Sequence, residues 1–171
     1  MDLCGDLLLA HLPATGPHAV AAGRVDPPFV RLAGRVPGLG RTNAAFNADR
    51  LFHRFVRAPR AARRAAPHFD LFHVVDHTYA QLVHELPGHR TGVYCHDLDA
   101  FRSVIEPARE PRPRWFRALA RRILTGMQKA AVVFHNSEQT GHELRHFGLV
   151  DPAKLRHVPL GVAAEFAAGP G

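Results

Sequence analysis

Three pairs of polar residues follow three short apolar segments of the chain, and their side chains suit the binding of hydroxyl or phosphate groups. Carboxylate, imidazole, amide and hydroxyl groups supply the paired donors and acceptors that a sugar requires. A carboxylate beside an imidazole can also fix the tautomer of the ring. We therefore treat these pairs as candidates for a binding or catalytic site. They are Asp76-His77, His96-Asp97 and Asn136-Ser137.

The segments that precede these pairs have the composition of buried strands, and helical patterns lie between them. Each strand candidate is short, apolar, β-branched or aromatic, and bounded by turn residues. The last helix candidate opens at Ser137, because serine is a favoured N-cap. The predicted strands are 71–75, 91–95, 131–134 and 155–159, and the predicted helices between them are 79–86, 114–129 and 137–148.

This alternation of strands and helices predicts both the fold class and the place of the site. It is typical of an α/β fold with a Rossmann-like parallel sheet and helices on both faces. Ligands of such sheets bind beyond the carboxyl ends of the strands, so the polar pairs and Tyr79 are expected at one edge. Such a domain usually begins with a buried strand and a glycine-rich turn, whereas this chain begins with a helical pattern. The first strand is therefore expected to be missing.

The first 69 residues contain two predicted helices and a long loop. The helices are 2–12 and 43–56, and residues 18–40 are expected to be loop with one short strand near 19–22. Amphipathic spacing defines the side of each helix that should face the core. The expected inward residues are Leu3, Leu7 and Leu8 in the first helix, Phe52, Phe55 and Val56 in the second, and Trp115, Leu119, Ile123 and Met127 in the helix 114–129.

Arginines form a stripe on the predicted outer face of the helix 43–56. Arg50, Arg54 and Arg57 make up this stripe, and residues 1–69 hold most of the net charge of +7. The stripe is interpreted either as a solvated helix face or as a surface for anionic lipid, where each basic residue adds about 1 kcal/mol of attraction. Nucleic-acid binding is not expected, because no nucleic-acid module or RNP-like aromatic motif is present.

Composition predicts an ordinary cytoplasmic domain, with the arginine stripe as its peripheral contact with the inner face of the membrane. The 171 residues are 46% apolar and hold neither a long uncharged apolar run nor a typical export signal. Cys4 and Cys95 cannot form a disulfide framework and are expected to be reduced and buried. No metal is expected, since no HxxxH or CxxC pair occurs together with a second ligand pair at a suitable distance.

Four short motifs, each near the end of a predicted strand, resemble glycosyltransferase family 4 in their order and spacing. The resemblance covers residues 69–166, and the helix 2–12 resembles the first helix of the family's N-terminal domain. The motifs are Phe69-Asp-Leu-Phe-His-Val-Val-Asp-His-Thr-Tyr79, Tyr94-Cys-His-Asp-Leu98, Val133-Phe-His-Asn-Ser-Glu-Gln-Thr140 and Val158-Pro-Leu-Gly-Val162 with Phe166.

The resemblance implies a retaining glycosyltransferase of the GT-B fold, in which two Rossmann-like domains face each other across a cleft. Residues 1–166 resemble the N-terminal, acceptor-side domain, and residues 167–171 resemble the start of the interdomain linker. Such an enzyme transfers a sugar from a nucleotide-sugar donor to a hydroxyl of a glycan, a lipid or a small molecule, and we expect no cofactor. The C-terminal donor domain is expected to be missing, so the chain is expected to be a fragment that is inactive alone.

The resemblance also assigns roles to the polar residues. His96 is expected to lie beside the transferred sugar and to contact the sugar or the diphosphate as the catalytic-site residue. The residues expected to bind substrate are Asp76, His77, Tyr79, Asp97 and Ser137.

Structural roles for the same residues remain open from the sequence. His96 could cap a loop, Asp76 could cap a helix while Tyr79 packs in the core, and Ser137 could be an N-cap alone. His73, within a predicted strand, is expected to be a core residue. The alternative function is then a non-catalytic α/β module that binds a phosphorylated or sugar ligand.

Overall fold

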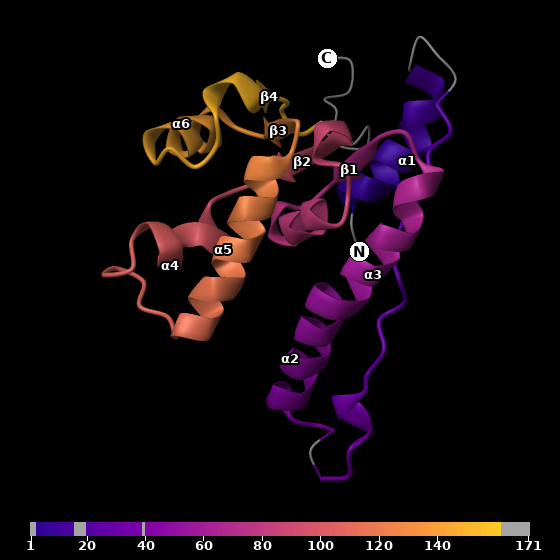
Figure 1. Ribbon diagram of the computed structural model, residues 1–171, viewed down its shortest axis with the longest axis vertical. Coiled ribbons are helices and arrows are strands. Elements are labelled where there is room, and N and C mark those ends of the chain that lie inside the picture. The colour runs from indigo at the N-terminus through magenta and orange to yellow at the C-terminus, as the bar shows by residue number, and fades with distance from the viewer. Residues whose placement is uncertain (1–2, 16–19, 39, 162–171) are drawn as a thin grey trace, which may run out of the picture.

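A parallel sheet of four strands forms the centre of the computed structural model, which describes residues 3–15, 20–38 and 40–161 (Figure 1). The strands lie in the order in which they occur along the chain, and the fold is of the Rossmann-like α/β class. Their bounds are Phe72–Val74 (β1), Thr91–Cys95 (β2), Val132–His135 (β3) and Leu155–His157 (β4).

The strand register aligns one apolar row across the sheet. Val74 pairs with Val93, Val93 with Val133, and Val133 with Leu155. All four side chains are buried in the hydrophobic core. Because all four strands run parallel, their carboxyl ends and the polar residues that follow them lie along one edge.

Helices connect the strands and cover the apolar row. The segment after β1 is a 3₁₀ helix, His77–His84, and the crossover from β2 to β3 holds α4, Arg102–Ile105, and α5, Arg114–Lys129. Helix α6, Glu138–His146, leads from β3 to β4. Helix α5 packs closely on the 3₁₀ helix at Gly126, where an added Cβ would collide with the carbonyl oxygen of Ala80.

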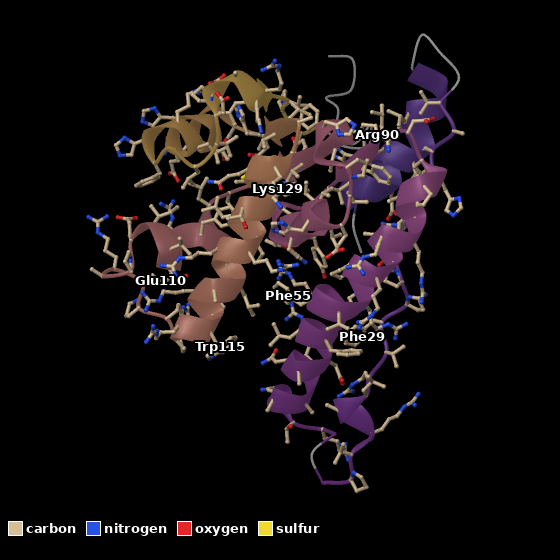
Figure 2. All side chains as sticks on the ribbon, in the orientation of Figure 1. Phe29, Phe55, Arg90, Glu110, Trp115 and Lys129 are labelled. Atoms are coloured by element: carbon tan, nitrogen blue, oxygen red, sulfur yellow. The ribbon has the colours of Figure 1, made fainter. Side chains whose placement is uncertain are left out.

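The N-terminal part of the chain is helical and contacts the sheet layer through the 3₁₀ helix. Helix α1, Leu3–Thr15, precedes α2, Asn43–Phe52, which continues through a π-helical turn, His53–Arg57, into α3, Ala58–Ala65 (Figure 1). Phe55 lies on this long helix and packs against the core (Figure 2). Further 3₁₀ turns span Ala33–Arg35, Ala66–His68, Gly88–Arg90, Asp99–Phe101 and Pro152–Lys154.

Two predicted elements differ in the structure. The short strand expected near 19–22 does not form at residues 20–22, and Ala19 lies outside the described residues. The helix expected over 79–86 is a 3₁₀ helix that begins two residues earlier, because the Asp76 side chain caps it by accepting a hydrogen bond from the Thr78 N–H.

Several side chains expected in the core are exposed. Leu7 and Leu8 of α1 lie on its surface, and Trp115, at the amino end of α5, keeps 58% of its area exposed (Figure 2). Phe52 is also exposed. His73 is exposed on the other face of the sheet, where its ring lies 5.5 Å from that of Phe134.

Candidate functional site at the carboxyl edge of the sheet

His77 lies at the carboxyl ends of the strands, among the polar residues that follow them, and its side chain is only 2% exposed. Its Nδ1 accepts a hydrogen bond from the His96 backbone N–H at 3.3 Å. The ring proton therefore belongs on Nε2, which lies 3.5 Å from Oδ1 of Asp97 without forming a hydrogen bond. The sheet thus brings the residues after β1 and β2 into direct contact, as their positions at the strand ends predict.

Burial keeps the His77 ring neutral. Burial lowers the pKa of His77 below its ordinary value of 6.5, while the carboxylates of Asp76 and Asp97 oppose this shift. The neighbouring charges of His96 and Arg54 lower the pKa further. A neutral, buried imidazole acts here as a hydrogen-bond acceptor that holds the loop after β2.

His96 is half-buried and has a defined tautomer. Its Nε2 lies 3.0 Å from the carbonyl oxygen of Val75, which can only accept, so Nε2 carries the proton. Nδ1 is left with the lone pair. The ring packs 4.9 Å from that of Tyr94, whose hydroxyl donates to the Val158 carbonyl. His96 is thereby held in one orientation by the ends of β1 and β2.

The two carboxylates of the edge are solvent-accessible. The Asp76 and Asp97 side chains are 43% and 56% exposed. Each accepts a hydrogen bond from the backbone two residues further on, the Thr78 N–H in one case and the Asp99 N–H in the other. One oxygen of each group is thus engaged locally, which orients the carboxylate beside the histidines.

Helix α6 joins the edge through Thr140. Ser137 is the N-cap of α6 and accepts the Thr140 N–H at 3.1 Å. The Thr140 hydroxyl lies 3.2 Å from the carbonyl oxygen of His96 and 3.3 Å from Oδ1 of Asn136. The residues after β2 and β3 are therefore bound to each other as well.

Arg54 does not lie on the outer face where the sequence pattern places it. Its guanidinium carbon is 4.8 Å from the centre of the Tyr79 ring, and its Nε and Nη2 are buried. Burial lowers the pKa of Arg54, while Tyr79 and Asp76 oppose the shift. The predicted lipid-facing stripe therefore loses its middle member, and Arg54 joins the surroundings of Tyr79.

Sequence reasoning missed Arg54 and Thr140 as parts of this site. Thr140 had a signal, because it lies three residues after Ser137, the spacing of a capping turn. No signal in the sequence indicated the position of Arg54, because that position depends on the π-helical turn 53–57. Cys95, by contrast, is free and buried as expected, and burial raises the pKa of its thiol to about 12. The side chain of Cys4 lies outside the described residues.

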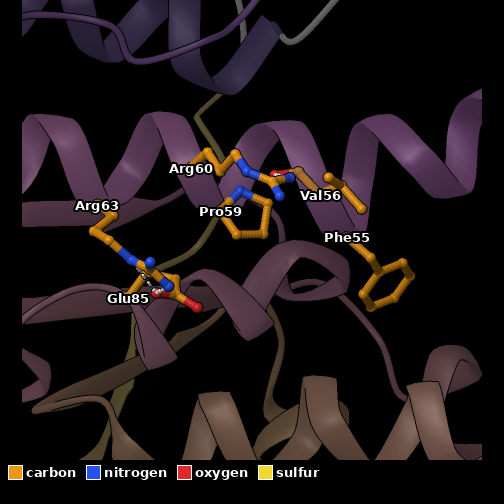
Figure 3. Close-up of a pocket in the computed structure, with 6 residues that line it drawn as sticks. All are labelled: Phe55, Val56, Pro59, Arg60, Arg63 and Glu85. Carbon is orange, nitrogen blue, oxygen red and sulfur yellow. Dashed lines mark hydrogen bonds and ion pairs between the residues drawn. The ribbon is translucent and has the colours of Figure 1, made fainter.

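A separate pocket of about 230 Å³ lies between α3 and the 3₁₀ helix (Figure 3). An ion pair of 2.6 Å between Arg63 and Glu85 crosses it. None of the candidate site residues lines this pocket. The lining residues are Phe55, Val56, Pro59, Arg60, Arg63 and Glu85.

The described part of the chain holds neither a cluster of metal-binding side chains nor a helix that could span a membrane. In residues 3–15, 20–38 and 40–161, histidine, cysteine and acidic side chains nowhere gather in a group of three or more that could hold a metal ion. Within the same ranges, every helix is too short or too polar to cross a bilayer.

Comparison with protein families gives a match over most of the chain. A family model described as Glycosyltransferase Family 4 matches residues 7–166, which is most of the chain. Searches of curated proteins and of solved structures gave no significant match.

Proposed function

The chain belongs to glycosyltransferase family 4, and from this membership we propose that it is the acceptor-side domain of a retaining sugar transferase. The reaction moves a sugar from a nucleotide-sugar donor to a hydroxyl of a glycan, a lipid or a small molecule. The observation that carries the proposal is the contact of His96, His77 and Asp97 at the edge where a Rossmann-like sheet binds ligands.

We propose that His96 contacts the transferred sugar or its diphosphate. Its Nε2–H is directed to the Val75 carbonyl, so Nδ1 is the nitrogen that can accept a hydrogen bond from a sugar hydroxyl. Protonation of the ring would add a donor for a phosphate oxygen. The contact with the phosphate oxygen strengthens as negative charge develops on the leaving diphosphate, and the contact with the sugar hydroxyl strengthens as positive charge develops on the sugar ring. Interactions that strengthen in the transition state lower the barrier.

The remaining residues divide by exposure into binding and positioning groups. Asp76 and Asp97, which are exposed, are proposed to accept hydrogen bonds from hydroxyl groups of the acceptor. His77 is buried and is proposed to act through the His96 backbone, while Ser137 orients α6 as its cap. Tyr79 packs against the core with Arg54 over its ring, so its hydroxyl is the group proposed to hydrogen-bond a sugar.

We further propose that the donor nucleotide is held by a C-terminal domain and that no metal or other cofactor takes part. The 171 residues alone are then expected to transfer no sugar. We also propose a cytoplasmic protein whose contact with an anionic membrane involves Arg50 and Arg57, because Arg54 is turned inward.

The test uses the enzyme completed with a donor domain and compares two histidine variants. His96→Ala is expected to lower kcat by about 100-fold or more, the loss caused by removing one well-placed polar group at a transition state. His89→Ala is the matched control, because His89 is exposed and precedes β2 at the opposite edge of the sheet. Normal turnover of His96→Ala would remove His96 from the site.

The isolated chain tests both functions together, because turnover by the 171 residues alone would contradict each of them, and the completed enzyme distinguishes one from the other. Incubation with UDP-sugars and GDP-sugars is expected to give neither hydrolysis nor transfer. A completed enzyme that binds sugar ligands but never transfers would instead support the non-catalytic binding module.

A further inference from the structure

The first turn of helix α5 exposes two aromatic side chains, Trp115 and Phe116. Their rings meet edge to face with centres 5.9 Å apart. The guanidinium carbon of Arg112 lies 5.5 Å from the centre of the Phe116 ring. Figure 2 shows Trp115 at the amino end of the helix, away from the sheet. Large apolar side chains that gather on the surface in this way favour an interaction site.

Three arginines beside these rings have no charge partner in the described part of the chain. Arg114, Arg117 and Arg121 line an open hollow on α5, together with Trp115 and Ala118. Their guanidinium groups form neither an ion pair nor a hydrogen bond with the described residues. The helix itself carries no acidic residue between positions 114 and 129. The hollow is therefore positively charged and open to solvent.

Other arginines near α5 are paired with carboxylates. Arg102 contacts Glu143 at 2.7 Å, and Arg109 contacts Glu106 at 2.7 Å. The described fold supplies a carboxylate to each of these arginines and to none of the three that line the hollow. Negative charge from a partner would therefore complement the hollow.

The exposed end of α5 projects on the same side of the sheet as the candidate site. The helix ends at Lys129, shortly before β3 begins at Val132, so its amino end points toward the carboxyl edge of the parallel sheet. Its buried residues begin only at Ala120. Residues 114–119 therefore extend beyond the packed core, where a broad, flat partner can approach them.

We propose that the amino end of α5 binds the surface of an anionic phospholipid bilayer. A tryptophan is suited to the headgroup region, because its ring is apolar and its N–H is polar. Basic side chains beside it are attracted to the anionic headgroups. The residues that make this contact, called the α5 surface below, are Arg114, Trp115, Phe116, Arg117 and Arg121.

A bilayer suits the α5 surface better than a small phosphorylated ligand does. A pocket for a small ligand encloses most of that ligand, whereas this hollow is open and lies along a single helix. Stacking of nucleic-acid bases is another use of exposed aromatic rings beside arginines, and the experiment includes it as an outcome. The inference deepens the membrane contact proposed above and rests on it only for the kind of partner, because Arg50 and Arg57 lie outside α5.

Trp115 makes the test specific, because it is the single tryptophan of the chain. The fluorescence of the 171-residue chain is measured with vesicles of phosphatidylcholine alone and with vesicles of phosphatidylcholine mixed equally with phosphatidylglycerol. We expect the emission to shift to shorter wavelength, and brominated lipids to quench it, only with the anionic vesicles. Flotation of the vesicles through a density gradient measures the binding, because aggregated protein does not float.

Two variants change the aromatic and the basic part of the α5 surface separately. Trp115→Ala should weaken binding in the flotation assay by about 10-fold, because the apolar ring no longer enters the headgroup region. The double variant Arg114→Gln/Arg121→Gln should weaken binding by about 30-fold, which is roughly five-fold for each charge. The matched control is Arg145→Gln/Arg156→Gln, which removes the same charge from exposed positions on α6 and β4. It should bind within about two-fold of the wild type, because charges far from the contact are screened.

Three outcomes would overturn the role of the α5 surface. Anionic vesicles that bind the chain without shifting the Trp115 emission would leave only the contact through Arg50 and Arg57. Equal binding of the wild type and of Arg114→Gln/Arg121→Gln would exclude the basic residues of the α5 surface from the contact. A shift with single-stranded oligothymidylate, and none with vesicles, would assign the surface to nucleic acid. Sugar transfer stands or falls separately, because the α5 surface contains none of the candidate site residues.

Discussion

At the scale of single residues, burial of His77 makes stability depend on pH near neutrality. The folded state lowers the pKa of this ring from 6.5, chiefly through burial, so the unfolded chain binds more protons as the pH falls through that range. The contribution of His77 is therefore fully present above pH 6.5 and is lost as the pH drops toward the folded pKa.

We predict that the Tm of the chain falls between about pH 7.5 and pH 5 and that His77→Gln flattens this dependence. A glutamine oxygen can still accept the His96 N–H but does not titrate. Circular dichroism melts across the range are the measurement. His84→Gln is a useful comparison, because burial also lowers the pKa of His84 and adds to the same slope. Equal slopes in the wild type and in His77→Gln would contradict the prediction.

At the scale of elements, Asp49 fastens the loop that precedes α2. Its Oδ1 accepts the backbone N–H groups of Leu32 and Ala33, and its Oδ2 accepts that of Gly34. Burial raises the pKa of Asp49, but these three hydrogen bonds outweigh it and lower the pKa from 3.8. The stability that Asp49 gives is therefore present above that pH and lost as the pH falls below it.

We predict that Asp49→Asn lowers the Tm at pH 7 and speeds proteolysis within residues 20–41. The amide replaces one accepting oxygen with a donor, which then faces a backbone N–H. Asn47→Ala, on the exposed side of the same helix, is the control and should change neither quantity. A loop that stays resistant in Asp49→Asn would show that other contacts hold it.

The elements best predicted from the sequence are those with strong local signals. The strand 91–95 and the helix 114–129 have the expected bounds, and the other three strands differ by one or two residues. Short apolar runs between turn residues give such signals, and Ser137 caps its helix as predicted. The placing of His77, His96 and Asp97 together also followed from their positions after strands, while their roles stay predictions.

Features that depend on distant contacts were not predictable. The expected outward position of Arg54 assumes a period of 3.6 residues, which the i to i+5 bonding of the turn 53–57 interrupts. The apolar spacing of α1 predicted a buried face, yet Leu7 and Leu8 find no covering element among the described residues. Trp115 lies in the first turn of α5, and only the later turns of this helix pack in the core.

At the scale of the whole molecule, the sheet has an open side at β1. Within the described ranges, β1 pairs only with β2, and Leu71 beside it is 76% exposed. An edge strand with an exposed apolar neighbour is a template for pairing with another chain.

We predict that the chain dimerises or aggregates as its concentration rises and that a strand added to pair with β1 makes it monomeric. Leu71→Lys should reduce association by placing a charge beside the edge strand β1. Leu51→Lys replaces an exposed leucine of α2, away from both edge strands, and is the control. Light scattering and melts over a concentration series are the measurements. A sharp melt of the wild type that is independent of concentration would refute the prediction.

The close approach of α5 to the 3₁₀ helix at Gly126 bears on how a mutational scan of this protein would be interpreted. Any side chain at Gly126 would push apart the two elements that position His77, so we expect substitutions there to lower activity as much as the loss proposed for His96. A scan that records only the loss of function would therefore place Gly126, which has no reactive side chain, among the active-site residues. A scan that scores cellular abundance alongside turnover would separate the two, since only Gly126 variants would lose the protein itself.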